Sequence, residues 1–336
     1  NPSIGVELEN FAGTGPYSLL DGAEATVTYE QRLERGGKQI ARVDRARAQT
    51  AVVRRRGEVR RLDYLRDVQR AYAEAMAAEA ALMVAEARYV ATAESQAEVA
   101  KRVKNARDPL FAAARAETLT AQAEIGRDQA REAAKAARLA LAAYWGGGDD
   151  FTLALEPFFQ VAAPAPQDLN PDHPDLALLA AERDAALADL QLERAQQITD
   201  PTVRAGLRYL GERSDVAVVI GGSIPLQRYD RNQGNVERAQ AARNAAEADL
   251  AAARRALERE IAALTPRVAA SARESERIRA EVIPAALETV DLVRQGFSRG
   301  GFDYSDVTDA ERALAEARAR RVDVLRVARP VAAGAP

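Results

Sequence analysis

Apolar and polar residues alternate in four short stretches of the chain, residues 3–11, 24–32, 202–210 and 216–226. A period of two over this length is typical of β-strands with one apolar and one polar face. We therefore predict four strands per chain, arranged as two pairs. The expected apolar side carries Ile4, Val6, Val27, Val218 and Ile220, and the expected polar side carries Thr26, Thr28 and Arg204.

A very long helical pattern follows each pair of strands. From about residue 40 to residue 104 the sequence has no proline and a single glycine, and apolar residues recur at spacings of three and four. A helix of this length extends about 100 Å, far more than the helices of globular domains. The second pattern runs from about residue 233 to 296 and contains Pro266 and Pro284, where we expect kinks.

Each long helix is followed by a break and then by a shorter return helix. The breaks cover residues 103–109 and 296–306, and the return helices end near Trp145 and near residue 328. One further helix is expected over residues 173–198. The pattern therefore predicts two long helical hairpins, each preceded by a pair of strands.

The two strand-to-helix transitions are separated by a fixed offset. The stretch LERGGKQIAR begins at Leu33, and LQRYDRNQGNVERAQ begins at Leu226, 193 positions later. The same offset aligns Val43 with Val236. A fixed internal offset indicates duplication, so each chain supplies two similar units.

The composition fits long helices better than one bulky globular core. Of the 336 residues, 47% are apolar but only 5% are aromatic. The net charge of −3, with basic and acidic residues interleaved, argues against a nucleic-acid partner. No stretch of 18 apolar residues occurs, so we predict no transmembrane helix. The chain starts at Asn1 without a visible leader, as we expect of a mature or trimmed product.

Catalytic and metal-binding motifs are not expected. Cysteine is absent and His173 is the only histidine, which excludes thiolate sites, histidine-based triads and multi-histidine metal sites. Asp168, Asp172 and Asp175 could hold a hard cation, but acidic residues are also typical of a helix start. We therefore predict no enzyme activity, no cofactor and no bound metal.

The predicted elements cannot bury their own apolar surfaces. Four strands leave open edges with unpaired backbone groups, and long alanine-rich helices need partners. A ring of identical chains would meet both requirements, because the strands would combine into a barrel and the hairpins into a helical tube.

Several stretches resemble the outer membrane efflux proteins, the TolC-like outer membrane factors. The resemblance rests on residues 1–17, 33–42, 223–243 and 296–319 and extends over essentially the whole chain. In particular, the chain is similar to the outer-membrane components of heavy-metal cation efflux systems of the cobalt–zinc–cadmium and cobalt–nickel type. The family normally has another helix before the first strand, so the chain looks like a trimmed version.

The resemblance implies a mainly α fold with a small β part. Three copies would form a 12-stranded outer-membrane β-barrel and a periplasmic tunnel of helical hairpins in a Gram-negative bacterium. The implied partners are outer-membrane lipid, a periplasmic adaptor (membrane fusion protein) and an inner-membrane RND pump. The implied function is passive export of divalent heavy-metal cations. The alternatives are an outer membrane factor for organic compounds or drugs, and a periplasmic coiled-coil adaptor or scaffold.

The expected domain organisation follows from this architecture. It comprises barrel strands at 1–35 and 200–229, a first hairpin at 36–145, an equatorial connector at 146–172, a tunnel-wall helix at 173–199, a second hairpin at 230–330 and a tail at 331–336.

The hairpin tips are the expected docking sites for the adaptor. Family members carry a pattern similar to Tyr-x-x-Gly-x-x-Ser/Thr at both tips. We expect Asn105 at the first tip to take the place of the glycine, since Asn tolerates a left-handed turn. Ordinary turn chemistry is the alternative. The implied docking residues are Arg102, Asn105, Asp108, Pro109, Phe297, Gly300 and Asp303.

Two acidic residues of the second return helix match the family's periplasmic constriction. Asp306 and Asp309 are three positions apart and therefore share one helix face. Threefold symmetry would bring up to six carboxylates to the axis, where they would attract cations and repel anions. An exposed acidic first turn of a helix is the alternative.

Overall fold

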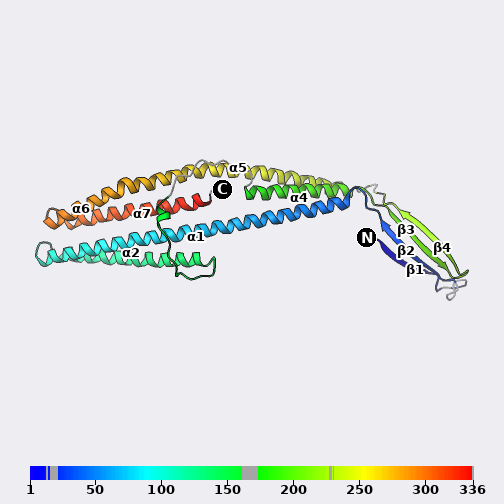
Figure 1. Ribbon diagram of the computed structural model, residues 1–336, viewed down its shortest axis with the longest axis horizontal. Coiled ribbons are helices and arrows are strands. Elements are labelled where there is room, and N and C mark those ends of the chain that lie inside the picture. The colour runs from blue at the N-terminus through cyan, green and yellow to red at the C-terminus, as the bar shows by residue number, and fades with distance from the viewer. Residues whose placement is uncertain (13, 16–21, 161–172, 227–228, 230, 335–336) are drawn as a thin grey trace. The chain divides into compact units, whose positions relative to one another are not determined.

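The computed structural model describes residues 1–336 except 13, 16–21, 161–172, 227–228, 230 and 335–336 (Figure 1). The strands are β1 (Ser3–Glu9), β2 (Glu24–Arg32), β3 (Thr202–Leu210) and β4 (Asp215–Ser223). The helices are α1 (Lys38–Lys104), α2 (Leu110–Ala142), α3 (Glu156–Phe159), α4 (Pro174–Gln196), α5 (Gln233–Arg277), the π-helix η3 (Ile278–Val282), α6 (Ile283–Arg299) and α7 (Tyr304–Gly334). The predicted fold class, mainly helical with four strands, is confirmed.

The chain forms two compact units. The first comprises residues 1–59 and 174–254 and holds the sheet, and the second comprises residues 60–173 and 255–336. Much of the expected connector lies outside the described residues, as do Asp168 and Asp172. The domain boundaries derived from the sequence therefore stay a prediction.

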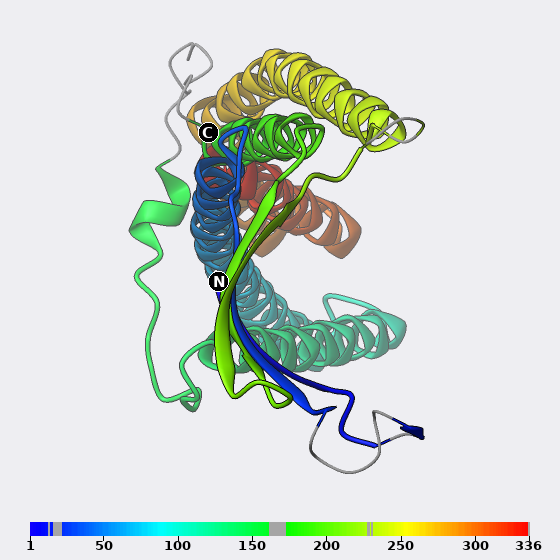
Figure 2. The same ribbon diagram turned by 90° about the vertical axis from the view of Figure 1, so that its right-hand side faces the viewer.

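The four strands of the first unit form one antiparallel sheet in the order β1-β2-β3-β4. Its register places apolar residues opposite one another, so that a row runs from Val6 through Val27 and Leu207 to Val218. Ile4 and Ile220 belong to the next row. Figure 2 shows the sheet as a long twisted ribbon. The predicted division of the strands into an apolar and a polar face is confirmed.

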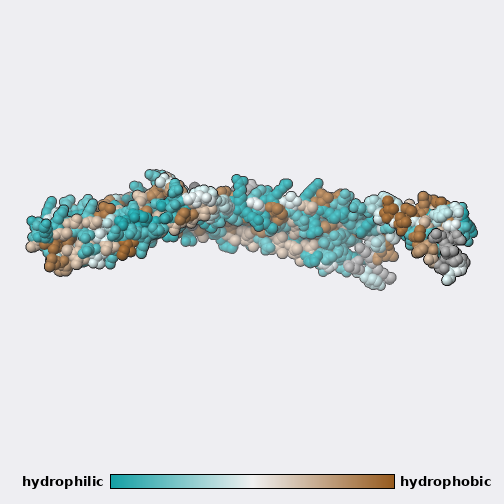
Figure 3. All heavy atoms as spheres, turned by 90° about the horizontal axis from the view of Figure 1, so that it is seen from below, coloured by the Kyte–Doolittle hydropathy of each residue, from teal (hydrophilic) through white to brown (hydrophobic). Residues whose placement is uncertain are grey.

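The apolar face of this sheet is exposed. Ile4 and Ile220, on the two edge strands, are 74% and 81% exposed, and Val27 in the interior is 50% exposed. Hydrophobic side chains gather over the strands, whereas hydrophilic ones cover most of the helical surface (Figure 3). A contiguous exposed apolar surface of this kind marks an interaction site.

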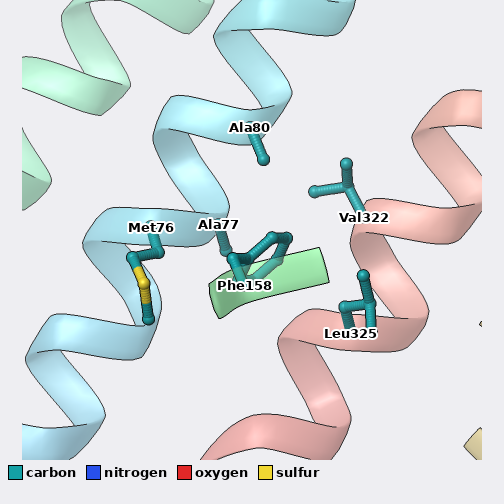
Figure 4. Close-up of a cluster of buried hydrophobic side chains, with 6 residues drawn as sticks. All are labelled: Met76, Ala77, Ala80, Phe158, Val322 and Leu325. Carbon is teal, nitrogen blue, oxygen red and sulfur yellow. The ribbon is translucent and has the colours of Figure 1, made fainter. Parts of the chain in front are cut away.

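The helices of the second unit pack through small side chains and a few large buried ones. Phe158 of α3 is fully buried between Met76 of α1 and Leu325 of α7 (Figure 4). Alanines of α1 line the same cluster and allow the helices to approach closely. None of the described helices is both long and apolar enough to cross a membrane.

The second long helix is interrupted once. Pro266 lies inside α5 without ending it, and the π-helix η3 immediately precedes Pro284. The expected kinks at the two prolines stay a prediction. Ile278 is buried and Ile283 is half-buried, and the four residues between them are exposed. The usual spacing of three or four is therefore stretched to five, and the π-turn absorbs the extra residue so that both isoleucines keep the same face.

Candidate functional site

At the tip of the first hairpin, an alanine in a left-handed backbone conformation follows the end of α1. Ala106 has a φ of 54°, and its N–H donates to the carbonyl of Val103 at 3.0 Å. The N–H of Arg107 donates to the carbonyl of Arg102 at 2.9 Å. This pair of bonds is a Schellman motif, in which the left-handed residue comes directly after the helix. The left-handed residue is thus Ala106, and the expectation that Asn105 would adopt this conformation is wrong.

The tip of the second hairpin has the same backbone arrangement. Gly300 has a φ of 83°, and its N–H donates to the carbonyl of Phe297 at 3.0 Å. The N–H of Gly301 donates to the carbonyl of Gly296 at 2.9 Å. The structural counterpart of Gly300 is therefore Ala106, one position after the residue that the sequence pattern aligned with it. Glycine adopts this conformation without the steric strain that a side chain causes.

Arg102 joins the two tips within the second unit. Its guanidinium makes a bidentate pair with Asp108, with Nε–Oδ2 at 2.9 Å and Nη2–Oδ1 at 2.8 Å. Its Nη1 donates to the carbonyl of Phe297, and its guanidinium carbon lies 4.2 Å from the centre of that ring. The planar guanidinium fork suits this combination of a carboxylate, a carbonyl and a ring face, which a lysine could not satisfy.

The electrostatics of this pair follow from its geometry. Hydrogen bonds from Arg102 hold the pKa of the Asp108 carboxyl below its usual value, against the opposing effect of burial. The same hydrogen bonds raise the pKa of Arg102. Both side chains are almost buried, so the pair is fully charged and shielded from solvent screening.

An apolar cluster lies beneath the tips. It comprises Val99, Ala112, Ala116, Phe297, Tyr304 and Val307. Burial raises the pKa of the Tyr304 hydroxyl, and the charge of Glu311 adds to the effect. The side chains of Phe297 and Tyr304 therefore belong to the core of the hairpin pair rather than to its surface.

The expected docking residues thus fall into two groups. Arg102, Asp108 and Phe297 are occupied by contacts inside the unit. The exposed members are Asn105, Pro109, Gly300 and Asp303. Sequence reasoning also missed Leu110 and Phe111, which follow Pro109 and are 82% and 70% exposed. Two adjacent bulky apolar residues directly after a break are the signal that could have identified them.

Asp306 and Asp309 both lie exposed in the first turns of α7, as expected from their spacing. Asp306 also caps the helix, because its Oδ2 accepts the N–H of Asp303 at 2.9 Å. Asp309 lies 3.4 Å from Nη1 of Arg312, in an exposed pair that contributes little to stability. Asp306 therefore has a structural role in addition to its predicted place in a constriction, whereas Asp309 is free of such a role.

Glu311, which the sequence analysis did not identify, links three helices of the second unit. Its Oε1 accepts hydrogen bonds from Oγ of Ser95 at 2.6 Å and from Nη2 and Nε of Arg294 at 2.7 and 3.0 Å. Arg294 also lies 3.3 Å from Glu94. The network holds α6 and α7 against α1. Ser95 and Glu311 are 216 positions apart, and no local pattern marks the residues of this network.

The polar face of the sheet carries a charged cluster around Arg208. This guanidinium lies 3.0 Å from both Glu9 and Glu24, and its Nε donates to Oγ1 of Thr26 at 2.9 Å. Four strand positions on three strands are thus tied together. The expected polar positions Thr26, Thr28 and Arg204 all lie on this face.

A second charged cluster, centred on the buried Asp200, fixes the junction between sheet and helix. Asp200 pairs with Lys38 at 2.7 Å and with Arg32 at 3.0 Å, and its Oδ1 accepts the N–H of Arg35 at 3.0 Å. Burial disfavours the charged carboxylate, but these hydrogen bonds and positive charges outweigh it and lower the pKa of Asp200. Gly36 has a φ of 71° and lies against Ile198, where a Cβ would clash. The junction therefore requires this glycine.

The described part of the chain contains no candidate metal site. No group of three or more His, Asp or Glu side chains in that part is arranged to hold a metal ion.

Part of the chain is similar to a known protein family. Residues 165–328 match the family described as outer membrane efflux protein. The match covers just under half of the chain. It confirms the resemblance to this family for the second strand-to-helix turn and the second tip, which both lie within the matched residues. The matched residues include β3, β4 and most of the second hairpin.

Curated relatives extend the likeness beyond the domain. The chain is 29% identical over 311 residues to the cobalt-zinc-cadmium resistance protein CzcC of Cupriavidus metallidurans, a match that covers 87% of this chain and 71% of the relative. It is 28% identical over 241 residues to the nickel and cobalt resistance protein CnrC of the same organism, covering 71% of this chain and 57% of the relative. The chain thus spans little more than half the length of the second relative.

Solved structures share the fold. The outer membrane protein VceC of Vibrio cholerae has a TM-score of 0.72 at 19% identity, with 100% of this chain and 85% of that chain covered. A membrane protein from Pseudomonas aeruginosa has a TM-score of 0.78 at 17% identity, with 100% and 82% covered. At these identities the likeness concerns the fold alone.

Proposed function

We propose that the chain is the outer-membrane exit duct of a tripartite efflux system and conducts divalent heavy-metal cations passively. The observation that carries this proposal is the four-stranded sheet with one exposed apolar face and one charged face. A water-soluble scaffold or adaptor has no use for such a sheet, because its apolar face would favour aggregation.

Closure of the sheet requires further copies. Strands β1 and β4 are the edges, and each has one side without a partner strand among the described residues. Three copies joined edge to edge would make twelve strands and leave no open edge. The nine residues of β2 extend about 30 Å and, tilted by about 40°, span about 23 Å. This height is close to the apolar band of outer-membrane barrels.

The polar face would then line the exit, and the hairpins would form the periplasmic tunnel. The cluster around Arg208 fits a water-filled interior, where charged side chains stay hydrated. Asp306 and Asp309 would face the axis and favour cations at the narrow end. The exposed tip residues Asn105, Pro109, Gly300 and Asp303 would contact a periplasmic adaptor, which delivers substrate from an inner-membrane pump.

The proposed substrate class rests on the relatives. The two relatives described above are named for resistance to cobalt, zinc and cadmium and to nickel and cobalt. An acidic constriction in an otherwise unspecialised duct is compatible with divalent cations. A duct needs no catalytic residues, since the pump supplies the driving force.

The proposal is tested by purification and complementation. The detergent-solubilised protein should have the mass of three chains, and it should restore cobalt, zinc or cadmium resistance to a strain that lacks its own exit duct but keeps the matching pump and adaptor. The variant Val218→Asp, which places a charge on the apolar face, should fail to insert into the outer membrane. A monomer that remains soluble without detergent would contradict the proposal.

A further inference from the structure

The two strand-to-helix turns expose leucine side chains at equivalent positions. Leu33 follows β2 and is 44% exposed, and Leu226 follows β4 and is 88% exposed. These are the two residues that the 193-residue repeat aligns. Large apolar side chains exposed at the same place in both copies point to a common partner.

Leu33 continues the apolar face of the sheet. Side chains alternate along a strand, so Leu33 has the parity of Val27, and its N–H donates to the carbonyl of Pro201 at 2.8 Å, which extends the pairing of β2 by one residue beyond the end of the strand. Leu226 lies three residues beyond the end of β4, beside the exposed Ile224. Exposed apolar side chains are therefore present at both turns.

Charge distinguishes this end of the sheet from the opposite end. The end at the strand-to-strand loops carries Glu7, Glu9, Glu24 and Asp215, of which Glu9, Glu24 and Asp215 lie in one cross-strand row with Leu210. Arg208 pairs with Glu9 and Glu24, so the acids outnumber the bases at this end. The turns instead carry Arg32, Arg35, Lys38 and Arg231. Arg32 and Lys38 pair with Asp200.

One arginine in each turn is left for an external anion. Arg35 and Arg231 are exposed, and neither side chain forms an ion pair with a residue in the described part of the chain. Each turn thus presents an exposed leucine and a free guanidinium. Apolar side chains beside long cationic ones are typical of segments at the boundary between acyl chains and phosphate groups.

We propose that the two turns are interfacial anchors for a leaflet of anionic phospholipid. Leu33 and Leu226 enter the boundary of the acyl chains, while Arg35 and Arg231 contact the lipid phosphates. The acidic end of the sheet then faces away from this leaflet, so the anchors also fix the direction of insertion. This inference rests on the proposed membrane location of the sheet.

Depth-dependent fluorescence quenching tests the anchors. Trp145 is the only tryptophan, so Trp145→Phe gives a silent background into which Leu33→Trp, Leu226→Trp or Val218→Trp is introduced singly. Each variant is reconstituted in phosphatidylglycerol vesicles whose acyl chains carry bromine at defined depths. The indole at 33 or 226 should be quenched best by bromine near the glycerol, and the indole at 218 by bromine deeper in the bilayer.

The outcomes separate the anchors from the duct itself. If the indole at 218 is quenched by brominated lipid but those at 33 and 226 respond only to aqueous acrylamide, the anchor inference is overturned and the sheet remains in the membrane. If none of the three responds to brominated lipid, the proposed function fails as well. In an Arg35→Gln/Arg231→Gln variant carrying Leu226→Trp, the preference for brominated phosphatidylglycerol over phosphatidylcholine should disappear. An unchanged preference would contradict the role of the two arginines.

Discussion

The guanidinium carbon of Arg102 lies 4.2 Å from the centre of the Phe297 ring, although the two residues are 195 positions apart and belong to different hairpins. The same guanidinium is held by Asp108 of its own tip. The two hairpins are thus joined at their ends by one side chain. The two tips are therefore coupled to each other through Arg102.

Removal of this link should loosen both tips. Arg102→Ala leaves a nearly buried carboxylate without its partner, which typically costs about 3–5 kcal/mol. Backbone hydrogen exchange around residues 99–116 and 293–308 should accelerate on the order of 100-fold or more, while exchange in the sheet stays unchanged. Arg107→Ala, which removes an exposed arginine from the same turn, is the control and should leave exchange at the second tip unaltered.

The pair at the first tip should also make tip stability depend on pH. The folded-state pKa of Asp108 lies below its unfolded value, so the pair stabilises the tip fully above the unfolded value of about 4 and less as pH falls below it. Hydrogen exchange of the tip, corrected for intrinsic rates, should show this loss as pH falls below about 4. Asp108→Asn should be less stable at neutral pH and should lack this acid-dependent loss. An identical pH profile for both proteins would rule out the pair as its cause.

Exchange of the left-handed residues between the two tips should have opposite effects. Ala106→Gly removes the strain of a positive φ from an alanine and should stabilise the first tip by up to about 1 kcal/mol. Gly300→Ala introduces the same strain and should destabilise the second tip by a similar amount or more. Local hydrogen exchange at each tip measures both. Asn105→Gly should not reproduce the gain, because Asn105 does not have a positive φ.

The strands were predictable because their signal is local. Alternation of apolar and polar residues identified β2 and β3 with their observed bounds, and the register confirmed which residues share a face. Helix lengths were predictable for the same reason, since periodicity and the scarcity of proline are read within a few turns.

The tips were harder to predict because the residue type that favours a left-handed conformation is not the residue that the backbone hydrogen bonds place there. Asn adopts a positive φ more readily than Ala does. However, the helix ends where the carbonyls of Arg102 and Val103 accept backbone N–H groups, and this bonding gives Ala106 the positive φ. The roles of Arg102 and Glu311 depend on partners about 200 positions away, for which a single sequence gives no signal.

Substitutions of Asp306 and Asp309 in α7 can separate the effect of their charge from the structural effect of the Asp306 cap. Asp306→Asn keeps an oxygen that can accept the N–H of Asp303, whereas Asp306→Ala also removes the cap and should cost about 0.5–2 kcal/mol. In planar bilayers, Asp306→Asn/Asp309→Asn should reduce the preference for cations over anions and weaken block by trivalent cations. Asp323→Asn, an exposed acid farther along α7, is the control. Unchanged selectivity in the double variant would place the constriction elsewhere.

In the proposed duct, β1 of one chain pairs with β4 of the next until three chains close the barrel. Because cysteine is absent, cysteines can be placed one at each edge, by combining Ile4→Cys, Val6→Cys or Leu8→Cys with Val216→Cys, Val218→Cys or Ile220→Cys. Within one sheet these edges are three strand spacings, about 14 Å, apart, too far for a disulfide. Oxidation in the outer membrane followed by non-reducing electrophoresis should give dimers and trimers for at least one combination and nothing larger. Monomers alone in every combination, or an open ladder beyond the trimer, would contradict the closed trimeric duct.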